Sequence, residues 1–125
     1  MEQVLGIGGF FFRARDPEAL GRWYEEMLGV PRPPATYEDA DWQQAAGPTV
    51  WGAFGQDDLT MAPRDHAWMI TFRVRDLDAM VAQLRAAGVS VEVDPERYPN
   101  GRFATCADPE NNPIQLWQVM GPTGA

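Results

Sequence analysis

Two stretches of the chain, sixty residues apart, carry the same pattern of hydrophobic and polar positions. FRARDPEALGRWYEEMLGV covers residues 12–30, and FRVRDLDAMVAQLRAAGV covers residues 72–89. In each stretch the residues alternate with a period of two up to an aspartate, Asp16 or Asp76, and hydrophobic residues then recur at helical spacing. The chain is therefore predicted to contain two copies of one supersecondary unit.

The residues around each aspartate predict where a helix begins and ends. Asp16 and Asp76 are good N-caps because a carboxylate can accept the first free helical N–H groups, and Pro17 loses no bond at the first helical position. Gly29 and Gly88 can close the helices in a left-handed conformation. Each copy is thus predicted to be a strand followed by a helix that ends at a glycine.

Short strand-like runs separated by turn residues follow each helix. DWQQAA and TVWGAF follow the first helix, and VSVEV, RFATCA and IQLWQV follow the second. Each unit then reads βαβββ, with module 1 at about residues 4–55, a polar linker at about 56–66 and module 2 at about 67–119. We expect an α+β fold that occupies residues 1–125 as one domain.

The overall charge narrows the classes of partner. A formal net charge of -8 and an isoelectric point near 4.4 disfavour nucleic acid and membrane surfaces. Cys106 is the only cysteine in the sequence, so the chain cannot form an internal disulfide. The N-terminus lacks the positive charge and apolar run of a signal peptide. These features predict a cytoplasmic protein.

The last strand and the turn before it carry a family resemblance. DPENNPIQLWQ, together with the FRxRD strand ends and the LG helix end, resembles the glyoxalase, bleomycin-resistance and extradiol-dioxygenase (vicinal oxygen chelate) superfamily. Asn111 replaces the family's glycine, and asparagine tolerates a left-handed conformation. The resemblance implies two βαβββ modules that form a curled mixed β-sheet around an open cavity. It also implies a homodimer, in which modules pair either within one chain or between two.

Members of this superfamily commonly hold a divalent metal in that cavity. The positions that the resemblance assigns to the metal ligands carry Gly9, Met69, Gln115 and either Val50 or Trp51. Only the glutamine offers an oxygen donor, and a thioether is a poor ligand for hard or borderline ions. We therefore expect no metal and no other cofactor.

Two other reactive side chains are assigned modest roles. His66 is expected to be a surface residue of the linker, because its strand parity opposes that of Met69. Cys106 has no nearby histidine in the sequence pattern, so we expect an inert, buried thiol. No catalytic residue is identified.

With metal ligands removed, the residues expected to line the cavity are mostly apolar or aromatic, which favours a planar or aromatic guest. The negative net charge also suits a cationic guest. The alternative to an open cavity is that these side chains fill the space and leave no room for a guest. The predicted ligand-binding set is Gly9, Phe11, Trp42, Trp51, Met69, Thr71, Phe103, Gln115 and Trp117.

Three functions remain open at this point. The first is metal-independent binding or sequestration of a small hydrophobic or aromatic molecule. The second is a lyase, isomerase or dioxygenase whose metal is held by an atypical set that includes Gln115. The third is a module that acts by association with another protein.

Overall fold

A computed structural model describes residues 1–60 and 65–120 and gives six regular elements. In chain order they are α1 (Pro17–Leu28), β1 (Ile70–Arg73), α2 (Leu77–Ala86), β2 (Glu92–Val93), β3 (Gly101–Ala107) and β4 (Pro113–Val119). The second half of the chain therefore forms the predicted strand, helix and three strands. The α+β class is confirmed.

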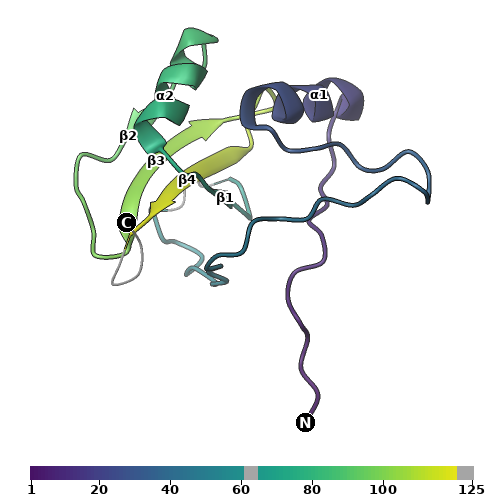
Figure 1. The fold of residues 1–125 in the computed structure, drawn as a ribbon. Helices are drawn as coiled ribbons and strands as arrows, with labels where there is room; N and C mark the ends of the chain where they lie inside the picture. Colours follow the sequence, from purple (N-terminus) through teal and green to yellow (C-terminus); the bar gives the residue numbers. More distant parts are fainter. Residues whose placement is uncertain (61–64, 121–125) are drawn as a thin grey trace.

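The four strands form one mixed sheet in the order β1-β4-β3-β2. β1 runs parallel to β4, while β3 is antiparallel to both β4 and β2. Both helices lie on the same side of this sheet (Figure 1). The hydrophobic core lies between sheet and helices and includes Leu20 of α1, Leu77 and Leu84 of α2, and Ile114 and Leu116 of β4.

The predicted helix signals are confirmed. The Asp16 carboxylate accepts a hydrogen bond from the Ala19 amide at 3.1 Å, and Asp76 does the same for Ala79 at 3.0 Å. Gly29 ends α1 with φ of 72°, a left-handed value that costs glycine little. Local capping chemistry thus fixes both helices.

The turn between β3 and β4 also follows its sequence. Asn111 adopts φ of 65° and is the only residue other than glycine with positive φ in the described part of the chain. A residue that stands in place of the family's glycine must adopt this left-handed conformation. DPENNP is therefore a hairpin turn.

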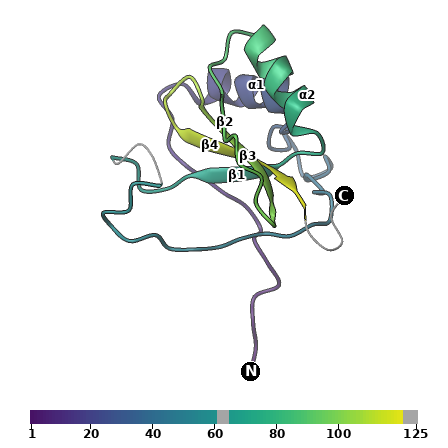
Figure 2. The same ribbon diagram turned by 90° about the vertical axis from the view of Figure 1, so that its left-hand side faces the viewer.

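The first half differs from the prediction. Within the described residues, it contributes only α1, and the strands expected before Asp16 and over DWQQAA and TVWGAF do not form. In both views the N-terminal segment extends away from the sheet and helices (Figures 1 and 2). Strands need a hydrogen-bonded neighbour, and these segments have none within the described single chain.

Side-chain alternation nevertheless survives in the first of these segments. The Phe10 and Phe12 rings pack against Trp68 with centroids 5.0 and 5.2 Å away, while Phe11 between them is 91% exposed. Phe10 and Phe12 therefore lie on one face of this segment and Phe11 on the other, although no strand forms.

No helix within residues 1–60 and 65–120 is long and apolar enough to cross a membrane.

Candidate functional site

The sheet face opposite the helices, which we call the open face, carries side chains from all four strands. Its members alternate along each strand with the residues that pack into the core. The open face consists of Met69, which precedes β1, and of Thr71, Arg73, Glu92, Phe103, Thr105, Gln115 and Trp117.

A polar row crosses the open face. Strand register places Thr71 beside Gln115, Gln115 beside Thr105, and Thr105 beside Glu92. The Thr71 hydroxyl donates to Gln115 Oε1 at 2.8 Å. The Gln115 side chain also carries two Nε2 protons, and the described residues offer them no partner.

An aromatic row lies next to the polar row. The Phe103 and Trp117 rings are stacked, with centroids 6.0 Å apart and planes 9° apart, and Tyr98 meets Phe103 edge-on at 5.9 Å. Trp117 Nε1 donates to the Asn100 carbonyl oxygen at 2.8 Å, and Trp117 is only 7% exposed. The indole is therefore a fixed part of the face.

Gly101 makes room for this indole. A Cβ atom at this position would lie 2.6 Å from Trp117 Nε1. The φ of 144° at Gly101 also disfavours any residue other than glycine. Glycine at 101 thus allows Trp117 to lie flat over β3.

A cavity of about 510 Å³ lies at the end of the open face where the polar row is found. Its volume is within the range of ligand pockets, roughly 300–1,000 Å³. Open-face residues in its lining are Met69, Glu92 and Thr105. Core-side residues, Val91, Cys106 and Ile114, also line it, so the cavity lies at the end of the sheet and beside the aromatic row rather than over it.

Five of the nine predicted binding residues come together on the open face. They are Met69, Thr71, Phe103, Gln115 and Trp117. Glu92 and Thr105 were not predicted from the sequence, although the alternation in VSVEV and RFATCA already places Thr105 on the face of Phe103.

The other four predicted residues make no ring contact with this face in the described chain. Phe11 and Trp51 are 91% and 87% exposed, and Trp42 is also exposed. Gly9 lies in the same unpaired N-terminal segment. Ring contacts in the described chain join none of them to the open face, so their role stays a prediction.

The donor positions implied by the resemblance do not fit a divalent metal. Gly9 has no side chain, Met69 offers a thioether, and the Gln115 oxygen already accepts the Thr71 proton. In residues 1–60 and 65–120, no three His, Cys, Asp or Glu side chains gather closely enough to hold an ion. We derive no chemistry through a metal.

Cys106 is half-buried on the helix side of β3. Burial, and then the negative charge of Asp108, raise the pKa of the Cys106 thiol to about 11. At neutral pH the thiol is therefore protonated, and the side chain lacks the thiolate that a nucleophile needs.

The Arg73 side chain is committed to the protein itself. Its Nη2 atom donates to the Ala45 carbonyl oxygen at 2.7 Å. The carboxylate of Asp78 on α2 binds Arg102 at 3.0 Å. The Arg73 guanidinium therefore anchors the segment that follows α1.

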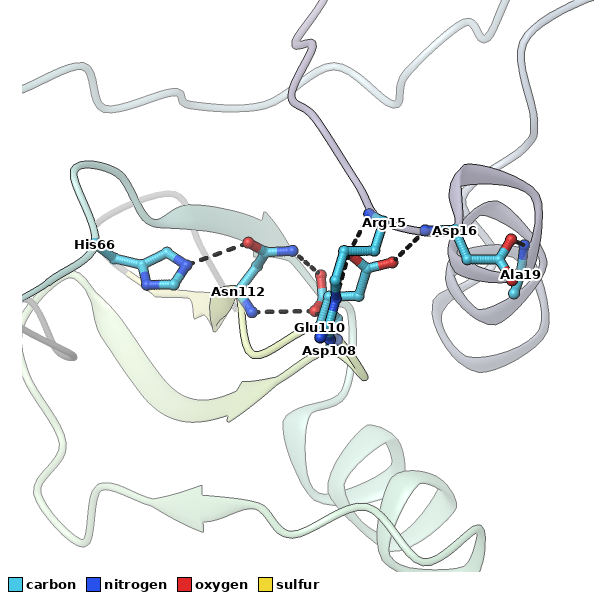
Figure 3. Close-up of polar contacts among 7 residues, drawn as sticks. All are labelled: Arg15, Asp16, Ala19, His66, Asp108, Glu110 and Asn112. Carbon is cyan, nitrogen blue, oxygen red and sulfur yellow. Dashed lines mark hydrogen bonds and ion pairs between the residues drawn. The ribbon is translucent and has the colours of Figure 1, made fainter.

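A polar network behind the open face joins the two halves of the chain (Figure 3). The buried Asp108 carboxylate accepts hydrogen bonds from the Tyr24 hydroxyl and from Asn112 Nδ2, both at 2.7 Å. Glu110 accepts the backbone N–H groups of Arg15 at 2.6 Å and Asp16 at 3.0 Å. The DPENNP turn therefore holds α1 in place.

His66 extends this network, so its assignment to the surface was wrong. Its side chain is 22% exposed, and its ring meets Trp68 edge-on with centroids 6.0 Å apart. Asn112 donates through Nδ2 to Asp108, so its Oδ1 accepts from His66 Nε2 at 3.2 Å. His66 packs on the helix side, opposite to Met69, as strand parity predicted.

Comparison with known proteins agrees with this architecture. The structure is similar to TnmS3, an antibiotic-binding protein from Streptomyces sp. CB03234, with a TM-score of 0.61 and 23% identity over 95% of this chain and 99% of that one. It is also similar to a glyoxylase/bleomycin resistance protein/dioxygenase domain from Frankia sp. EAN1pec, with a TM-score of 0.55 and 16% identity over 94% and 99% of the two chains. At these identities the likeness shows a shared fold.

A protein-family model identifies the family of the chain, which the structural similarity alone does not. No curated protein matches the sequence. The model of the glyoxalase-like domain matches residues 9–117, which is most of the chain. The protein therefore belongs to the glyoxalase-like domain family.

Proposed function

We propose that the protein binds a small hydrophobic or aromatic molecule on the open face without a metal. The observation that carries this proposal is the fixed aromatic pair, Phe103 and Trp117, beside a glutamine whose amide protons have no partner in the described chain. Aromatic stacking contributes about 0.5–1.5 kcal/mol per pair beyond area burial, and a few hydrogen-bonding groups orient the guest.

A binding role has more support than a metal-dependent lyase, isomerase or dioxygenase. The metal-donor positions carry Gly9, Met69 and an amide already engaged by Thr71, and the Cys106 thiol is protonated at neutral pH. TnmS3, whose fold this chain shares, is itself an antibiotic-binding protein. This likeness supports a small-molecule guest of the same general kind.

The direct test is a panel of planar aromatic metabolites and antibiotics. We expect at least one compound to raise the melting temperature and to change the intrinsic tryptophan fluorescence, because Trp117 forms part of the site. Pre-treating the protein with a chelator should leave both signals unchanged. Loss of binding after chelation, restored by one divalent ion and absent in Gln115→Ala, would instead support the metal-dependent enzyme.

A second copy of the chain is proposed to complete the curled cavity and the second βαβββ module. All but one of the exposed large hydrophobic side chains in the described residues lie between Met1 and Leu59, in the half whose strands are unpaired. β1 is an edge strand with one free side. Exposed apolar segments and an open edge together favour pairing between chains.

Such a dimer would bring Phe11, Trp42 and Trp51 of one chain toward the open face of the other. The first-half strands would gain the hydrogen-bond partners that they lack here, and an aromatic wall would face Phe103 and Trp117. The proposed homodimer thus closes the binding site. It does so because modules of the two chains pair with one another.

Light scattering coupled to size-exclusion chromatography should give about twice the chain mass of 13.9 kDa. Trp51→Glu places a charge on the proposed interface, so we expect it to shift the protein to a monomer that keeps α1 and α2, as followed by circular dichroism. Ala82→Glu, on the exposed side of α2, is the matched control and should remain dimeric. A monomeric wild type would contradict the proposal.

A further inference from the structure

One charged side chain lines the cavity on the open face. Among the described lining residues, Glu92 is charged, and the others are hydroxyl, apolar or amide side chains. Salt bridges in the described chain engage acids that include Glu18, Glu25, Asp65, Asp78 and Glu110, and none of these bridges involves Glu92. The carboxylate is therefore available to a guest.

The neighbouring acid is not available in the same way. The Asp94 carboxylate accepts the Tyr98 hydroxyl at 2.7 Å and the Glu96 backbone N–H at 3.0 Å. These bonds, the backbone bond first, hold the pKa of Asp94 below its usual range. Asp94 thus fixes Tyr98 against Phe103 and leaves Glu92 as the free charge beside the cavity.

The basic side chain of the open face lies at its opposite edge. Arg73 is on β1, Glu92 is on β2, and β4 and β3 separate them. The Arg73 guanidinium is held by the Ala45 carbonyl oxygen. With strands about 4.8 Å apart, the two side chains stand roughly 14 Å from one another across the face, so Arg73 does not neutralise Glu92.

We infer that Glu92 determines ligand specificity, and that the guest is a planar aromatic cation whose positive charge lies at the β2 edge of the open face. This inference rests on the proposed binding function. Stacking on the partly exposed Phe103 ring, which packs against Trp117, supplies the contact with the ring system, and the Glu92 carboxylate selects the charge. The faces of aromatic rings also attract cations.

Three acridines with one ring system separate charge from shape. At pH 7.5, 9-aminoacridine is a cation, acridine is neutral and acridine-9-carboxylate is an anion. We expect 9-aminoacridine to bind about five-fold tighter than acridine, the upper end for an exposed ion pair, and the carboxylate to bind most weakly. Isothermal titration calorimetry measures all three, and added salt should reduce the cation preference.

Glu92→Gln should abolish this preference, so that the variant binds 9-aminoacridine and acridine with equal affinity. Glu26→Gln is the matched control, because it removes the same charge from an exposed position on α1, behind the sheet. Retention of the five-fold preference in Glu92→Gln, or its loss in Glu26→Gln, would overturn the inference.

Failure of the inference is distinguishable from failure of the proposed function. If acridine and 9-aminoacridine bind equally, the role of Glu92 is wrong while aromatic binding stands. If no acridine binds, the inference is wrong for this ring class, and the wider compound panel then decides the proposed function on its own.

Discussion

Replacing Asp108 with alanine is expected to lower the free energy of unfolding by about 3–5 kcal/mol. The buried carboxylate accepts hydrogen bonds from the Tyr24 hydroxyl, from the Asn112 side chain and from the backbone N–H groups of Glu110 and Asn112. Each buried donor left without an acceptor costs about 1–3 kcal/mol, and water recovers part of the sum. Urea unfolding followed by circular dichroism measures the change.

Tyr24→Phe is the informative companion to this variant. It removes one donor without leaving another orphaned, so its cost should be about 1.5–3 kcal/mol, the value for one hydrogen bond to a charged group. Glu26→Ala, at an exposed position of α1, should change stability by less than about 0.5 kcal/mol. An Asp108→Ala cost no larger than that of Glu26→Ala would show that the turn does not hold α1.

Thr71→Trp is expected to weaken ligand binding at least a hundredfold. Thr71 is exposed on the open face, so an indole there would occupy the space of the guest, and the substitution also frees the Gln115 oxygen. A hundredfold loss corresponds to about 2.8 kcal/mol, which displacement of one stacked ring system and its hydrogen bond can supply. Calorimetry with the tightest compound of the panel measures it.

Ala82→Trp is the matched control for this substitution. It adds the same side chain at an exposed position of α2, on the side of the sheet away from the guest, and should leave affinity unchanged. Both variants should unfold near the wild-type temperature. Unchanged affinity in a folded Thr71→Trp would place the binding site elsewhere and would favour the module that acts by protein association.

Local chemistry made much of the fold predictable. The caps at Asp16 and Asp76, the left-handed Gly29 and Asn111, and the alternation through β1, β3 and β4 each depend on a few adjacent residues. The same alternation brought Met69, Thr71, Phe103, Gln115 and Trp117 onto one face. Periodicity reports such positions because a strand alternates its side chains whatever its neighbours are.

The remainder depends on contacts between distant residues. The sequence pattern of DWQQAA or TVWGAF carries no record of the strand that must lie beside it, so the missing first-half strands were not foreseen. The bond from Tyr24 to Asp108 spans 84 residues, and the contact of His66 with Asn112 spans 46. Strand parity gave the correct side for His66 but not its burial, because packing partners decide burial.

The dependence of α1 on the DPENNP turn has a consequence for synthesis on the ribosome. Leu20 and Tyr24 belong to a core whose other buried residues lie between Leu77 and Leu116. At roughly 5–20 residues per second, translation of the remaining part takes several seconds, during which the aromatic first half has no core to join. The nascent chain is therefore a natural client for chaperones that shield aromatic segments.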